Sequence, residues 1–84
     1  MNRYLILAMR TPQFDPAVIV PHAAHLDRLR EQGRLELAGP FTDSTGGAYL
    51  VRAETLAAAQ AIAATDPVHT SGSSRVSVHE WNAR

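Results

Sequence analysis

The segment Arg3-Tyr-Leu-Ile-Leu-Ala-Met-Arg10 decides the fold, because residues 4–9 are continuously apolar. A short run of this kind predicts a β-strand that is covered on both of its faces. A loop with two prolines follows over residues 11–16. This strand is therefore the first element of the predicted fold, and other apolar side chains must pack against both of its faces.

The next stretch predicts a helix that begins at Asp15 or Pro16 and ends at Gln32. Aspartate caps helices well, and proline suits the first helical position. Gly33 is a natural C-terminal stop. Pro21 lies inside this range, so it either kinks the helix or marks its true start, with residues 16–20 forming a separate turn.

Two strands are expected next, over residues 35–41 and 48–53, joined by a hairpin turn at 43–47. Gly39-Pro40 interrupts the first of them, and proline in a strand indicates an edge strand or a bulge. The pattern is typical of a hairpin that follows a helix.

The last part of the chain predicts a helix, a polar turn and a strand. Thr55 caps an alanine-rich helix over residues 56–65, which Asp66-Pro67 ends. Residues 75–81 then alternate, with Val76 and Val78 on one face.

The resulting order, β-α-β-β-α-β, is typical of an α+β, ferredoxin-like fold in a single domain over residues 1–84. Two helices cover one face of a four-stranded antiparallel sheet in this plan. The first strand is apolar on its other face too, and a patch of that kind is large for a monomer. We therefore expect a homodimer in which the two sheets stack as a dimeric α+β barrel. The alternative is a monomer that tolerates a few exposed apolar residues.

Composition excludes several classes of function. Eight Lys+Arg balance eight Asp+Glu, which argues against a nucleic-acid partner or an anionic membrane surface. Cysteine is absent, so disulfides, thiolate nucleophiles and cysteine-bound metals are excluded. No targeting segment or membrane span is recognisable, and a cytoplasmic protein is expected.

His22 and Asp66 are the candidate catalytic residues. On a helical wheel His22 lies near the centre of the apolar stripe of the first helix, with His25 at the margin. Asp66 lies on the buried side at the end of the second helix, where the macrodipole disfavours a negative charge. A His–Asp pair suits acid–base catalysis, because the carboxylate fixes the tautomer and the other ring nitrogen moves a proton. The alternatives are a structural core histidine and an aspartate that simply ends a helix.

Other residues could contact a ligand or a metal. His22 and His25 could share a metal ion, but no third ligand has a fixed spacing, so no metal or cofactor is expected. Tyr4 and Trp81 could fill the core or a dimer interface. The candidate substrate-binding residues are His25, Gly39, Pro40, His69, Ser71 and Gly72.

Two stretches resemble the YciI-like (YCII-related) family. The first is His22-Ala-Ala-His-Leu-Asp-Arg-Leu29, followed by Glu31-Gln-Gly-Arg-Leu-Glu-Leu-Ala-Gly-Pro40. The second runs from Thr55-Leu-Ala-Ala-Ala-Gln-Ala61 through Asp66-Pro67 and Gly72 to Arg75-Val-Ser-Val78 and Trp81. The resemblance implies a dimeric α+β barrel and an active-site His and Asp at the positions of His22 and Asp66. One branch of that family removes chloride from a chlorinated hydroxyquinol.

The chain departs from the family pattern in two places. Residues 68–73 are more polar than is usual after the Asp-Pro pair, which implies a different pocket wall and substrate. His79-Glu80 replaces a more usual basic-Pro pair before Trp81.

The expected function is a cofactor-free, small-molecule enzyme that uses the His–Asp pair on a cyclic or aromatic compound. A lyase, isomerase or dehydrohalogenase step fits, because such a step needs proton transfer alone. The alternatives are a non-catalytic ligand-binding or accessory dimer in a metabolic pathway, and a purely structural dimer module.

Overall fold

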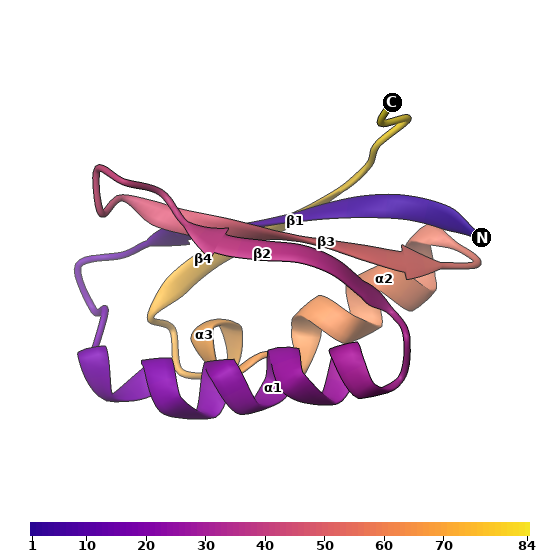
Figure 1. The fold of residues 1–84 in the computed structure, drawn as a ribbon. Coiled ribbons are helices and arrows are strands. Elements are labelled where there is room, and N and C mark those ends of the chain that lie inside the picture. The colour runs from indigo at the N-terminus through magenta and orange to yellow at the C-terminus, as the bar shows by residue number, and fades with distance from the viewer.

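The computed structural model describes residues 1–84 and has a four-stranded antiparallel sheet with all helices on one face (Figure 1). The strand order is β2-β3-β1-β4, so the ferredoxin-like α+β prediction is confirmed. The elements are β1 (Asn2–Arg10), a 3₁₀ turn η1 (Pro16–Val18), α1 (Ile19–Glu31), β2 (Leu35–Pro40), β3 (Gly46–Ala53), α2 (Leu56–Ala64), α3 (Pro67–Thr70) and β4 (Ser74–Glu80).

β1 is a central strand, paired with β3 on one side and β4 on the other, and its side chains alternate between the two faces of the sheet. Tyr4, Ile6 and Ala8 are buried beneath the helices. Leu5 and Leu7 alternate with them and are half-buried on the helix-free face. No helix or strand of the same chain lies over this outer face of the sheet (Figure 1), where the apolar Leu5 and Leu7 lie beside the charged Arg3 and the buried Leu50.

The main core lies between the sheet and the helices. Ile6 and Val51 are fully buried, and Ala59 and Ala63 of α2 pack against the same cluster. Alanine lets a helix approach the sheet closely because its side chain is small. Burial of each large aliphatic side chain contributes about 1.5–3 kcal/mol to folding.

The helix expected from Asp15 or Pro16 divides into two pieces. Asp15 caps η1 through a bond from the Ala17 N–H, and α1 begins only at Ile19. Pro21 falls in the first turn of α1, where a missing N–H removes no intrahelical bond. The alternative with a separate turn before Pro21 is therefore closer to the structure than a kinked helix.

The polar turn expected after Asp66 is confined to residues 71–73, because residues 67–70 form the short helix α3. Asp66 is the N-cap of α3, and its side chain accepts a hydrogen bond from the Val68 N–H. α2 stops at Ala64 with Thr65 as its C-cap, and Asp66 is extended, as the Asp-Pro pair predicts. The unfavourable helix-end position expected for this carboxylate is thus replaced by a favourable capping position.

Pro40 lies in an edge strand, as predicted, because β2 is the first strand in the order of the sheet. The register irregularity falls between Leu35 and Leu37, however, and not at Gly39-Pro40. Pro40 pairs regularly with Gly47.

None of the helices combines the length and apolar character needed to cross a bilayer.

Candidate functional site

His22 and Asp66 meet between α1 and the start of α3. The Nδ1 atom of His22 lies 2.8 Å from Oδ1 of Asp66. The His22 side chain is 23% exposed and the Asp66 side chain is 0% exposed. The predicted contact is therefore present, with the histidine toward the surface and the acid behind it.

Both oxygens of Asp66 are occupied by donors. Oδ1 accepts from His22 and from the Val68 N–H at 3.0 Å, and Oδ2 accepts from the Tyr49 hydroxyl at 2.8 Å. Burial by itself would raise the pKa of Asp66, but these hydrogen bonds outweigh it and hold the pKa below its usual value. Asp66 is thus a carboxylate at neutral pH.

The carboxylate fixes the role of each nitrogen in the His22 ring. A carboxylate only accepts hydrogen bonds, so Nδ1 carries a proton and donates it to Asp66. Nε2 is then left to exchange a proton with a ligand. This division is what acid–base chemistry by an imidazole requires.

Tyr49 of β3 is the third member of this cluster, and the sequence reasoning missed it. Its ring meets His22 edge-on with centroids 6.0 Å apart. Burial, followed by the nearby charge of Asp66, raises the pKa of the Tyr49 hydroxyl, so the group remains a donor. The available signal was a tyrosine in an apolar strand, because a buried phenol needs a hydrogen-bond partner.

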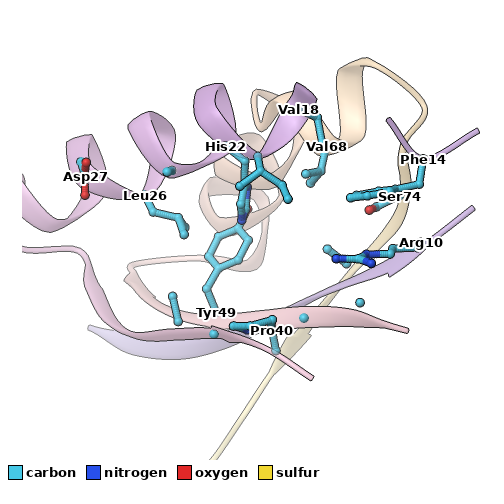
Figure 2. Close-up of a pocket in the computed structure, with 18 of the residues that line it drawn as sticks. Arg10, Phe14, Val18, His22, Leu26, Asp27, Pro40, Tyr49, Val68 and Ser74 are labelled. Carbon is cyan, nitrogen blue, oxygen red and sulfur yellow. The ribbon is translucent and has the colours of Figure 1, made fainter. Parts of the chain in front are cut away.

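A cavity of about 520 Å³ opens between α1 and one end of the sheet, and His22 and Tyr49 lie on its wall (Figure 2). This volume is in the range typical of small-molecule sites, about 300–1,000 Å³. Gly39 and Pro40, two of the candidate substrate-binding residues, line it. The other lining residues are Ala8, Arg10, Phe14, Val18, Ile19, Ala23, Leu26, Asp27, Arg30, Ala38, Gly46, Gly47, Ala48, Val68 and Ser74.

His25 does not line the cavity, and the helical-wheel placement of the two histidines is wrong. His25 is 5% exposed and packs edge-on against Tyr49, while His22 borders the cavity. The open side of α1 carries Ile19, which is 50% exposed. The apolar stripe is therefore shared between the core and the cavity, so its centre does not mark the most buried position.

His25 is buried with its Nε2 atom unpartnered. Burial lowers its pKa, and the charges of Arg28 and His22 lower it further against the opposing charge of Asp66. His25 and His22 do not form part of any group of three potential metal ligands.

His69, Ser71 and Gly72 lie outside the lining of the cavity. His69 borders a separate, smaller hollow beside Gln60 and Val78. The hydroxyls of Ser71 and Ser73 are 2.9 Å apart, and Thr11 donates to the Gly72 carbonyl at 2.7 Å. These contacts shape the turn before β4, because a polar turn must satisfy its own backbone.

Arg10, Phe14 and Ser74 are cavity residues that the sequence reasoning did not select. Strand alternation contains the signal for Arg10, since it shares the face of Ile6 and Ala8. Only the fold brings the other two beside it.

Comparison with known proteins gives a family model and a curated relative that match this chain. The family model of the YCII-related domain matches residues 2–82. The uncharacterized protein YjpA of Bacillus subtilis (strain 168) is 43% identical over 84 residues, with 100% of this chain and 99% of YjpA covered.

The fold is also similar to a solved structure. The 5-chloro-2-hydroxyhydroquinone dehydrochlorinase (TftG) of Burkholderia phenoliruptrix AC1100, in complex with 2,5-dihydroxybenzoquinone, superposes with a TM-score of 0.72. The match covers 98% of this chain and 95% of that one at 22% sequence identity.

Proposed function

The chain belongs to the YCII-related domain family, and on that premise we propose that it is a small-molecule enzyme that uses His22 and Asp66 for acid–base chemistry. The observation that carries the proposal is the 2.8 Å bond from His22 to a buried carboxylate at the wall of a cavity. Its ligand is a small cyclic or aromatic compound, and the reaction is of the lyase, isomerase or dehydrohalogenase type.

Each residue has a distinct part in this proposal. Asp66 holds the proton of His22 on Nδ1 and balances the imidazolium that forms when Nε2 takes a proton. Tyr49 occupies the second oxygen of Asp66, which keeps the carboxylate oriented toward His22. The apolar wall of Ala8, Val18 and Val68 suits a flat ring.

The loss of hydrogen chloride from a chlorinated ring compound is one reaction that these residues could catalyse. The ring first takes its keto form, in which one hydroxyl proton has moved to the carbon that bears chlorine. Nε2 of His22 then takes a proton from another O–H group of the ligand, the electron pair of that O–H bond forms a C=O bond as the ring double bonds shift, and the C–Cl bond breaks to release chloride. The proton then passes from His22 to water. The name and ligand of TftG, which shares this fold, support a ring compound as the substrate.

The test replaces His22 with glutamine, which retains an N–H donor for Asp66 and removes the base. Turnover is followed as chloride release from 5-chloro-2-hydroxyhydroquinone and as deuterium exchange into the ring positions of 2,5-dihydroxybenzoquinone. We expect His22→Gln to lower both rates by at least about a hundredfold. His69→Gln is the matched control, because His69 lies outside the cavity. Equal rates in the two variants would contradict the proposal.

A non-catalytic ligand-binding role is the second candidate, and the capping of α3 by Asp66 favours it. In that case the His22–Asp66 bond serves folding alone. The wild type would then catalyse neither chloride release nor deuterium exchange, and His22→Gln would leave ligand affinity unchanged, while His22→Ala would lower the melting temperature.

We further propose that the functional unit is a homodimer in which the helix-free faces of two sheets meet. Leu37 and Trp81, which are 68% and 46% exposed, belong to or border that face together with Met9. An uncovered apolar surface of this kind is typical of a protein–protein interface.

A further inference from the structure

One end of the cavity carries polar donors that the His22–Asp66 pair does not use. Arg10 is the last residue of β1 and Ser74 is the first residue of β4, and the two are paired on these neighbouring strands. Figure 2 shows both side chains with Phe14 at the end of the cavity away from Asp27. His22 and Tyr49 lie between the two ends.

Arg10 is a cation without an acidic partner. Its guanidinium carbon lies 4.1 Å from the centroid of the Phe14 ring, and no carboxylate of the chain forms an ion pair with it. A guanidinium that covers an aromatic face keeps its N–H donors free for partners beside the ring. Phe14 thus positions a charged donor that has nothing to bind within the chain.

The other cavity arginine is already satisfied. Arg30 binds Asp27 at 2.9 Å on the exposed surface of α1. Arg10 is therefore the unbalanced cation of the cavity wall, and a negatively charged ligand group would be drawn to its end of the cavity.

Ser74 adds a second donor beside Arg10. The residue is 7% exposed, and its hydroxyl makes no hydrogen bond within the chain although it borders the cavity. A hydroxyl in that position can donate to an oxygen that the guanidinium also binds. A charged and a neutral donor from adjacent strands form a site for one ionised oxygen.

We propose that Arg10 and Ser74 bind an ionised oxygen, a carboxylate or an acidic enol, on a planar ring whose other side reaches His22. This inference rests on the proposed function and names its substrate class. The Ala8 and Val68 side chains lie in the same wall and would contact the ring. The anionic group sets the orientation of the ring, so that one edge faces the base.

The experiment measures binding and needs no turnover. Isotope-labelled protein is titrated at neutral pH with 4-hydroxybenzoate, with its neutral methyl ester and with 2,5-dihydroxybenzoquinone, and the amide shifts are followed by NMR. We expect the carboxylate or the acidic enol to bind at least about tenfold more tightly than the ester. Tighter binding of 4-hydroxybenzoate would identify the ionised oxygen as a carboxylate, and tighter binding of 2,5-dihydroxybenzoquinone would identify it as an acidic enol.

Arg10→Gln should weaken binding of the preferred anion by about tenfold or more and leave the affinity for the ester unchanged. Arg75→Gln is the matched control: Arg75 lies across from Met9, one pair away from Arg10 and on the opposite sheet face. It removes the same charge, yet should change anion affinity by less than about threefold.

Three results would overturn the inference: equal affinity for acid and ester, equal losses in Arg10→Gln and Arg75→Gln, or no shift of cavity amides with any anion. His22→Gln separates this inference from the proposed function. If that variant binds the anion normally but exchanges deuterium as fast as the wild type, the anion site stands and the catalytic role fails.

Discussion

His22 and Asp66 are 44 residues apart in the chain, and their side chains lie 2.8 Å apart in the fold. The same carboxylate caps α3 and receives the Tyr49 hydroxyl. One buried acid therefore joins a helix, a strand and the start of a second helix. Removal of this acid should affect folding as well as the proposed chemistry, so the two effects must be measured separately.

Asp66→Ala should lower the free energy of unfolding by about 3 kcal/mol, because it leaves the buried Tyr49 hydroxyl and the Val68 N–H without an acceptor. Urea denaturation at neutral pH measures this loss. Asp27→Ala is the control, since Asp27 is 66% exposed in a surface ion pair, and it should cost less than about 1 kcal/mol. Similar losses in both variants would mean that the Asp66 cluster does not stabilise the fold.

Tyr49→Phe should lower the free energy of unfolding by about 1–2 kcal/mol at neutral pH, because it removes one buried hydrogen bond to a carboxylate. Tyr4→Phe is the control, because the Tyr4 hydroxyl has only long contacts of 3.3 and 3.4 Å. Tyr4→Phe should lower the free energy of unfolding by less than Tyr49→Phe does.

The stability lost in Tyr49→Phe should depend on pH, because the pKa of Asp66 is lowered in the folded protein. A group whose pKa is lowered by folding stabilises the protein above its unfolded pKa, about 3.9, and this contribution is lost as pH falls through the folded value. The difference between wild type and Tyr49→Phe should therefore narrow below about pH 4. A difference that stays constant through the acid range would show that Tyr49 does not act through the ionised carboxylate.

His25→Leu should raise the free energy of unfolding by about 1 kcal/mol at neutral pH, because it removes an unpartnered buried nitrogen. The pKa of His25 is lowered by burial, so the unfolded chain takes up the proton first as pH falls below about 6.5. Wild-type stability thus falls below that pH. The variant should lose part of this slope, while the exposed-site control His79→Leu should retain it; equal slopes would contradict the burial argument.

Sequence periodicity was sufficient to predict the order and type of the main elements. The apolar run of β1 predicts a central strand, and Gly33, with φ 71°, ends the first helix as expected. α3 was missed because Pro67-Val-His-Thr70 is too short to show a helical period. Asp66, its N-cap residue, instead matches the pattern of a helix end, because it precedes a proline.

The candidate site was predictable only in part, for a physical reason. His22 and Asp66 could be paired because two helices on one face of a sheet lie near each other. The donors at the other end of the cavity could not, because Arg10 and Ser74 meet through strand pairing between the two ends of the chain. Composition does not distinguish ligand binding from the structural roles that His69 has in α3 and that Ser71 and Gly72 have in the turn before β4.

Gly47→Ala should lower the free energy of unfolding by about 1–3 kcal/mol, because a Cβ atom there would lie 2.7 Å from the Gly39 carbonyl oxygen. Gly39→Ala is the matched control in the neighbouring strand, where a Cβ atom meets nothing within 4 Å. Thermal unfolding of both variants measures the difference. An equal shift of the two melting temperatures would show that β2 and β3 adjust without cost.

The proposed dimer can be tested separately from the fold of the single chain. Sedimentation at micromolar concentration should give a dimer for the wild type. Leu37→Glu should shift it toward the monomer, because Leu37 is paired with Leu50 in the helix-free face and is 68% exposed. The substitution buries no charge in the monomer, so circular dichroism should remain unchanged.

Val20→Glu is the control for this experiment. Val20 is as exposed as any apolar residue of the chain, at 77%, but it lies on α1, on the side of the sheet away from the proposed interface. It should leave the dimer intact. If both variants dissociate equally, the helix layer takes part in association. If the wild type is a monomer, then Leu5, Leu7 and Leu37 face water, and the apolar outer face of β1 needs another explanation.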